Sequence, residues 1–220
     1  MCAYTRWSIG VLCAAVIGAA PVAGAAVDPY VPTAAEKKAL RVHVIPQAAI
    51  ELAGAWRYDP EAIEECAVPA LAAAVRNLAK FPSYSFSVAQ VPLLEPLENR
   101  APDLWKSVVA LVAAGRMEVA GGNYLEFDGA CVGGEALVRQ FSAGREFLRG
   151  KLGQGPRICW SLSTVAHPWT LPQILRKSEI DTYVFLRGAP RPTFLWEGID
   201  GSKVLAVRPL TGAGVPEAVA

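Results

Sequence analysis

The stretch from Pro156 to Arg187 constrains the fold most strongly, because it has the pattern of a strand, a loop, a helix and a second strand. Arg157–Leu162 is an apolar run that predicts a buried strand, and Thr182–Leu186 predicts the next one. Between them, Thr170–Ser178 predicts an amphipathic helix. The stretch therefore forms a βαβ unit, and the loop carrying His167 follows a strand at its carboxyl end, where α/β folds bind ligands.

The preceding part of the chain repeats this alternation. The segment 92–102 is rich in proline and predicts a polar connection, and Pro69 is expected to kink or split the helix that contains it. We expect Val138, Phe141 and Phe147 to point inward from a later helix. The predicted strands are Arg41–Ile45, stopping at Pro46, then Tyr84–Val88 and Met117–Ala120; the predicted helices are Pro60–Lys80, Asp103–Ala114 and Gly134–Leu148.

The end of the domain predicts a hairpin. Phe194–Trp196 and Lys203–Val207 are its strands, and Asp200-Gly201 suits a type I′ turn. Alternating strands and helices predict an α/β fold, a mostly parallel sheet or partial barrel covered by helices.

Composition limits the class of protein. The chain has 220 residues, 53% of them hydrophobic, with a net charge of +1, which is enough for one domain with a substantial core. So balanced a charge speaks against an electrostatic nucleic-acid binder.

The first residues predict a secretory signal peptide spanning residues 1–25. Arg6 gives the positive start, Trp7–Ala20 is apolar but short for a membrane span, and Ala23-Gly24-Ala25 has the small-residue cleavage pattern. We expect cleavage before Ala26, a secreted or periplasmic location and no membrane association afterwards; an uncleaved anchor is the alternative. Residues 26–40 then form a leader, 41–208 the domain and 209–220 an irregular tail.

Three cysteines remain after cleavage, namely Cys66, Cys131 and Cys159. They allow one disulfide at most, and their pairing is left open. Cys159 lies in an apolar strand and is expected to be a buried structural thiol.

Three collinear pieces of the chain resemble the N-terminal domain of the family 38 glycoside hydrolases, the zinc-dependent α-mannosidases. They are GGNYLEFDGACVGGEALVRQ, HPWTLPQIL and WEGIDGSKV, and RVHVIPQAAIEL resembles that family's opening strand and metal loop. The resemblance runs from about Arg41 to Val207. It implies a partial irregular (β/α) barrel with mostly parallel strands, and retaining hydrolysis of α-mannosides by two carboxyl groups and a zinc ion.

The metal loop of that family reads Ile-Pro-His-x-His-x-Asp. In this sequence Gln47 and Ala49 stand at the two histidine positions and Glu51 at the aspartate. Alanine cannot bind a metal, and tight zinc sites use imidazole or thiolate ligands, so we expect no zinc cofactor here. His43 is expected to be a structural histidine rather than a substitute ligand.

The nucleophile is also replaced. The family's Trp-x-Pro-Asp-x-Phe-Gly-His aligns with 160–167, which places Ser163 where the aspartate would be. A Ser163–His167 hydrolase is an alternative, although the G-x-S-x-G elbow is absent.

Four other residues are candidates for substrate binding. Glu126 and Asp128 fall in the family's Glu-x-Asp loop, and each could equally anchor that loop by hydrogen bonds. His167 shapes the next loop by the resemblance, and Trp169 could stack on a pyranose. For Asp200, an Asx turn is a sufficient explanation.

Three interpretations of function follow. The first is a degenerate, secreted α-mannosidase-like domain that has lost hydrolysis and binds carbohydrate, such as an α-mannoside glycan, or another partner. The second is a zinc-dependent retaining α-mannosidase whose missing groups come from further sequence or another chain. The third is a non-functional remnant. Retention of LPQIL and DGS beside the loss at Gln47, Ala49 and Ser163 favours the first.

Overall fold

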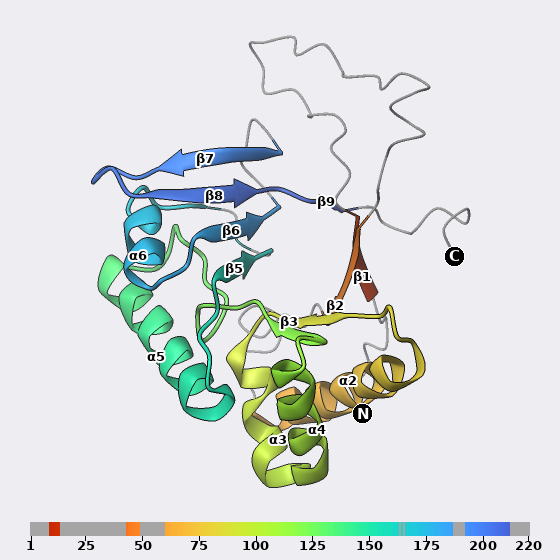
Figure 1. Ribbon diagram of the computed structural model, residues 1–220. Coiled ribbons are helices and arrows are strands. Elements are labelled where there is room, and N and C mark those ends of the chain that lie inside the picture. The colour runs from red at the N-terminus through yellow and green to blue at the C-terminus, as the bar shows by residue number, and fades with distance from the viewer. Residues whose placement is uncertain are drawn as a thin grey trace, which may run out of the picture.

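The strands form two sheets, each with helices against one face (Figure 1). The computed structural model describes residues 9–13, 43–48, 60–162, 164, 166–186 and 192–211. The first sheet has the order β4-β3-β2-β1-β9 and the second the order β5-β6-β8-β7. Their bounds are β1 Ile9–Cys13, β2 Val44–Ala48, β3 Phe86–Val88, β4 Met117–Val119, β5 Ile158–Ser161, β6 Thr182–Phe185, β7 Thr193–Glu197, β8 Lys203–Val207 and β9 Leu210–Thr211.

Parallel pairing dominates the centre of both sheets. β2, β3 and β4 run parallel, as do β5, β6 and β8, whereas β1 lies antiparallel to β2 and β9, and β7 antiparallel to β8. The predicted βαβ unit is confirmed, since Ile158 pairs with Thr182 and Ser161 with Phe185 across α6. The described strands do not close into a complete ring, so the fold is a partial barrel of the predicted α/β class.

The helices connect the strands. α2 (Pro60–Lys80) links β2 to β3, while η1 (Val91–Leu93), α3 (Glu95–Arg100) and α4 (Pro102–Ala113) lead to β4. α5 (Gly134–Leu152) precedes β5, and α6 (Leu171–Lys177) precedes β6. None of the helices within the described ranges is both long and apolar enough to cross a membrane.

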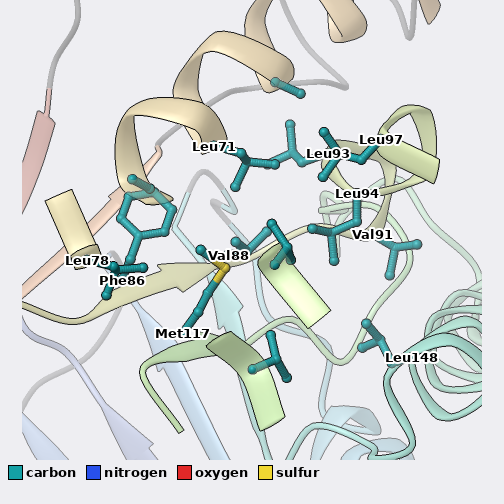
Figure 2. Close-up of a cluster of buried hydrophobic side chains, with 14 of the residues drawn as sticks. Leu71, Leu78, Phe86, Val88, Val91, Leu93, Leu94, Leu97, Met117 and Leu148 are labelled. Atoms are coloured by element: carbon teal, nitrogen blue, oxygen red, sulfur yellow. The ribbon is translucent and has the colours of Figure 1, made fainter. Parts of the chain in front are cut away.

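The first core lies between the first sheet and its helices (Figure 2). Leu71 and Leu78 reach down from α2 towards Phe86 and Val88 of β3 and Met117 of β4. All are nearly or fully buried, and each such side chain contributes about 1.5–3 kcal/mol by leaving water.

The second core is more aromatic and lies on the helical face of the second sheet. Phe141, Tyr183 and Phe185 are buried there, and Tyr183 and Phe185 stack with ring centroids 5.4 Å apart. A small third cluster lies between the two sheets, on the faces that the helices do not cover. It contains Ala120, Trp160 and Val184, with Ile45 packed against it.

Two predictions about strands and connections are wrong. β2 continues through Pro46 to Ala48, and its pairing with β3 is at Gln47, beyond the proline, so no bond to β3 depends on the missing N–H. The segment 92–102 is largely helical, and Val91, Leu93 and Leu97 are fully buried under α2. The prolines that suggested a loop lie at the starts of short helices, where no N–H is needed.

Two predictions about helices also need correction. α2 runs unbroken through Pro69, so the helix is not split there, and the kink stays a prediction; Pro69 is exposed, so the carbonyl freed one turn earlier can bond to water. In α5 the buried face contains Leu137, Phe141 and Gly144, whereas Val138 is 45% exposed. Gly144 sets this face, because a Cβ atom there would lie 2.8 Å from the backbone of Asn123.

Three smaller features differ from expectation. Asp200 lacks the positive φ of a type I′ turn; only Gly201 has it, at φ 81°, and its N–H bonds to the Gly198 carbonyl at 3.0 Å. His43 is exposed before β2 instead of structural. The expected irregular tail begins with strand β9.

β1 lies within the predicted signal peptide. Ile9–Cys13 pairs with β2 and with β9, so cleavage before Ala26 would remove a strand from the first sheet. The cleavage itself stays a prediction.

Candidate functional site

The carboxyl ends of β2 to β5 carry five of the six buried polar residues in the described part of the chain; the sixth, Ser87, lies within β3. Gln47 lies near the end of β2, Gln90 follows β3, Asn123 follows β4, and Ser161 and Thr164 are at the end of β5. Each is 5% exposed or less. Polar side chains are buried at a cost unless they are hydrogen bonded, so this set marks the candidate site.

A chain of hydrogen bonds runs through the second-sheet side of the site. Thr164 Oγ1 donates to the Phe127 carbonyl, Ser161 Oγ contacts Thr164 Oγ1, and the Tyr183 side chain bonds to that of Ser161. His167 Nδ1 lies 3.0 Å from the Tyr183 hydroxyl.

The carbonyl at the end of this chain fixes every proton in it. Since Thr164 gives its only proton to the Phe127 carbonyl, Ser161 must donate to Thr164, and Tyr183 must donate to Ser161. His167 Nδ1 therefore carries a proton and donates to Tyr183. The imidazole is held as a structural donor in this chain.

The surroundings keep the Tyr183 hydroxyl and the Cys159 thiol neutral. Burial, the negative charge of Cys159 when ionised and that of Glu126 raise the pKa of the Tyr183 hydroxyl. Burial likewise raises the pKa of the Cys159 thiol, and its Sγ donates to Asn123 Oδ1 at 3.5 Å. The expectation that Cys159 is a buried structural thiol is confirmed, and Cys66, Cys131 and Cys159 form no disulfide with one another.

Gln47 lies on the opposite, inner face of the first sheet. It pairs with Ser87, which in turn pairs with Glu118, so these three side chains share one face of the strands. Gln47 is 4% exposed, and its Oε1 has no hydrogen-bond partner. Among the buried side-chain nitrogens and oxygens of the described residues, Trp160 Nε1 is the other one without a partner. An unpaired buried amide oxygen costs about 1–3 kcal/mol, which is unusual outside a binding site.

The sequence-predicted substrate residues divide into two pairs. Glu126 and His167 both lie near Tyr183, Glu126 through its charge and His167 through its hydrogen bond. His167 also packs edge-to-face on Tyr183, Phe185 and Trp196, on the helical side of the second sheet. This loop therefore does not stay at the carboxyl ends of the strands but runs back along the outer face of the sheet.

Asp128 and Trp169 are on the surface instead. Asp128 is exposed and its Oδ1 accepts from the Ala130 N–H at 3.0 Å, which is the loop-anchoring role considered as an alternative. Trp169 is 78% exposed and lies beside the β7–β8 turn. Asp200 forms the expected Asx turn, with its Oδ1 3.1 Å from the Ser202 N–H. Ala49, Glu51 and Ser163 lie outside the described residues.

A hollow of about 900 Å³ opens at the amino ends of the strands and reaches along the inner face of the first sheet, where Ser87 and Glu118 line it. Ser85, Arg116, Arg157 and Asp181, the residues just before β3, β4, β5 and β6, are among its lining. Catalytic groups of barrel enzymes collect at the carboxyl ends, so this hollow is not the candidate site.

Comparison with known proteins decides the family. The model of the glycosyl hydrolases family 38 N-terminal domain matches residues 39–212. The chain belongs to glycosyl hydrolase family 38. Human alpha-mannosidase 2C1 is 31% identical over 174 residues, which are 74% of this chain and 16% of that protein. Alpha-mannosidase G of Dictyostelium discoideum is 27% identical over 172 residues, 75% of this chain and again 16% of the relative.

Solved structures show the same fold. An alpha-mannosidase from Enterococcus faecalis V583 superposes with a TM-score of 0.55 at 22% identity, covering 61% of this chain and 16% of that one. A family 38 protein from Enterococcus faecalis gives 0.55 at 21% identity, covering 67% and 17%. This family 38 chain thus spans about one sixth of the length of the relatives it matches.

Sequence reasoning missed the buried hydrogen-bond chain. The strand patterns of residues 157–162 and 182–186 include Ser161 and Tyr183 but do not predict that their side chains meet. The available signal was the run Ser161-Leu162-Ser163-Thr164, in which hydroxyl side chains follow an apolar strand directly.

Proposed function

We propose that this family 38 domain is a secreted α-mannosidase-like protein that has lost hydrolysis and retains carbohydrate binding. The observation that carries the proposal is Gln47. It stands at a metal-histidine position, is buried, and presents an unpaired amide oxygen to the inner face of the sheet.

The residues at the family's metal positions do not fit zinc. Gln47 offers a neutral amide, Ala49 offers nothing, and Ser163 replaces a carboxylate that would both bind the metal and attack the sugar. Zinc sites require three or four imidazole, thiolate or carboxylate ligands, and Glu51 alone supplies one. Retaining hydrolysis also needs a nucleophilic carboxylate about 5 Å from the acid, and serine without a base is no substitute.

The retained scaffold favours binding over decay. The pieces that position the site, including the β5–α6–β6 unit and the polar side chains at the carboxyl ends, form a hydrogen-bonded and well-buried framework. A neutral glycan offers hydroxyl donors, and Gln47 Oε1 is a buried acceptor on the inner face that lacks a donor.

Zinc content and turnover test the proposal. The purified protein, incubated with excess zinc and dialysed, is analysed for metal and assayed with an aryl α-mannoside beside an active family 38 α-mannosidase. We expect less than about 0.1 zinc per chain and no turnover above the uncatalysed rate. Stoichiometric zinc with turnover would overturn the loss of hydrolysis and support the alternative, a piece of an active α-mannosidase.

A revertant sharpens this test. Combining Gln47→His, Ala49→His, Glu51→Asp and Ser163→Asp restores the four positions that the resemblance assigns to metal and nucleophile. We expect the revertant to bind about one zinc, because the backbone geometry is inherited. The same four substitutions with Gln47→Asn in place of Gln47→His form the matched control and should bind more weakly.

Secretion is tested separately. We expect the protein exported from a host with a secretory pathway to begin at Ala26. An exported protein that still carries Ile9–Cys13 would show that β1 belongs to the mature fold.

A further inference from the structure

Trp169 is an exposed aromatic side chain with no role in either core. It is 78% exposed, whereas Trp160 is buried and Trp196 is half-buried against the second core. A single exposed apolar residue is ordinary on a protein surface, so its exposure alone assigns no function. The arrangement of the loops around it provides the argument.

Two separate turns pack closely against the Trp169 segment. At Gly129, a Cβ atom would lie 2.3 Å from the Ala166 carbonyl oxygen and 2.5 Å from Pro168 Cδ, so only glycine fits. At Gly198, in the β7–β8 turn, a Cβ atom would lie 3.4 Å from the Trp169 carbonyl oxygen. The backbone that carries Trp169 is therefore held by two turns that lie about 40 residues before it and about 30 residues after it in the sequence.

Each of these turns carries an exposed aspartate that is fixed by its own backbone. Asp128 Oδ1 accepts from the Ala130 N–H at 3.0 Å. Asp200 accepts from the Ser202 N–H at 3.1 Å and from the Ser202 hydroxyl at 2.8 Å. The Ser202 hydrogen bond holds the pKa of Asp200 below its usual value, so this group stays ionised. Carboxylate oxygens have about four acceptor positions, so both aspartates can accept further hydrogen bonds.

These groups suit one class of ligand. An indole face can stack on an apolar surface, and the fixed carboxylates on the two turns that pack against its segment accept hydroxyl donors, which together match the C–H face and the hydroxyl edge of a pyranose. An anionic ligand would be repelled by the two aspartates, and a purely aliphatic one would desolvate them without replacing their hydrogen bonds. Ile199, 68% exposed on the same turn as Asp200, extends the apolar area.

We propose that Trp169, Asp128, Asp200 and Ile199 form a surface site, the Trp169 platform, that binds a neutral hexose unit of a glycan outside the barrel. The choice of a glycan rests on the proposed function; the position of the platform rests on the loop contacts alone. The platform differs from the Gln47 site in location, since it lies on the β7–β8 turn and the loop before α6.

Titration with α-1,2-linked mannotriose, followed by isothermal calorimetry and by tryptophan fluorescence, tests the platform. Trp169→Ala should weaken binding roughly tenfold or more and remove the change in emission, because the indole no longer buries its face. Trp169→Phe should stay within about threefold of the parent, because a flat ring remains. Asp128→Asn and Asp200→Asn should each weaken binding about two- to fivefold, since the amide keeps one acceptor oxygen.

Phe81→Ala is the matched control. Phe81 is 46% exposed at the end of α2, far along the chain from the platform, and its removal should leave affinity unchanged. Melting curves of all variants check that each is folded.

The outcomes separate the platform from the proposed function. If Trp169→Ala binds mannotriose as well as the parent, or if the parent binds neither mannotriose nor cellotriose nor xylotriose at millimolar concentration, the platform is overturned. If the protein holds zinc and hydrolyses mannosides but Trp169→Ala still loses glycan binding, the platform stands although the proposed function has failed.

Discussion

The strands of this protein present two contrasting faces. Their outer faces carry Phe86, Val88 and Met117, which are 7% exposed or less and pack against helices. The inner face of the first sheet carries Gln47, Ser87 and Glu118 in register. The outer face thus has the composition of a core, whereas the inner face is polar. The stabilising contacts of the first sheet and Gln47, which stands at a position that the resemblance assigns to a metal ligand, therefore lie on opposite faces of the same strands.

The largest expected effect is on the free energy of unfolding, and it differs between the helix-covered outer faces and the inner faces of the sheets. Leu71, which is 1% exposed above β3, should lose about 2–5 kcal/mol of unfolding free energy on Leu71→Ala. Leu195, 63% exposed and in register with Leu205 and Thr182, should lose less than about 0.5 kcal/mol on Leu195→Ala. Denaturant unfolding measures both. Similar losses would show that the inner face of the second sheet is covered.

The hydroxyl chain should be the next most sensitive feature. Tyr183→Phe keeps the ring that stacks on Phe185 but removes the hydroxyl between His167 and Ser161, leaving both without that partner. We expect a loss of about 1–3 kcal/mol in unfolding free energy. Tyr84→Phe is the control, at a half-buried tyrosine just before β3 whose side chain bonds to that of Asn77. An unchanged stability for Tyr183→Phe would mean that the chain adds nothing to the fold.

The inner face should respond in the opposite direction. Gln47→Met replaces the unpaired amide oxygen by an apolar side chain of similar length, so the cost of burying that oxygen disappears. We expect a gain of up to about 1 kcal/mol, measured by denaturant unfolding. A loss greater than about 1 kcal/mol would show that the amide is a stabilising group rather than a binding group.

The smallest expected effect concerns the ion pairs between Glu179, just after α6, and Arg145 and Arg149 of α5. Hydrogen bonds from Arg145 and Arg149, followed by their charges, hold the pKa of Glu179 below its usual value against a small opposing effect of burial. This stability is present above the unfolded pKa of the carboxyl and is lost as pH falls through the lower folded pKa.

We therefore expect Glu179→Gln to melt slightly below the parent at pH 7. The two melting temperatures should become equal at a pH low enough to protonate Glu179 in both the folded and the unfolded parent. The difference should also shrink in high salt, because the Glu179 and Arg149 side chains are 66% and 52% exposed. A salt-insensitive difference would point to the left-handed backbone at Glu179, φ 59°, as the cause.

Much of the fold and of the family followed from local patterns. The β5–α6–β6 unit, the α2 face with Ile63, Ala67 and Leu71, and the order of strands and helices all depend on periodicity within short windows. The motifs that begin at Gly121, Gly134 and His167 indicate family 38 from the sequence alone, and the family model agrees.

The errors arose where distant segments meet. Leu93 and Leu97 were assigned to a polar connection because prolines and glutamates surround them, yet α2 buries both. The inward face of α5 depends on Gly144 meeting the backbone at Asn123, a contact that the helical pattern of α5 does not contain.

The sequence by itself determined most of the elements and which residues stand at the positions that the resemblance assigns to the metal and the nucleophile, since residue identity and short-range spacing suffice for both. Only the tertiary structure decided where the polar groups end up. His167 is placed among aromatic rings, Trp169 on a turn at the surface, and Gln47 with an unpaired oxygen on the inner face. The physical reason is that burial and hydrogen bonding of these side chains depend on segments well outside the local window, such as Tyr183, 16 residues after His167, whose approach is set by packing and not by local propensity.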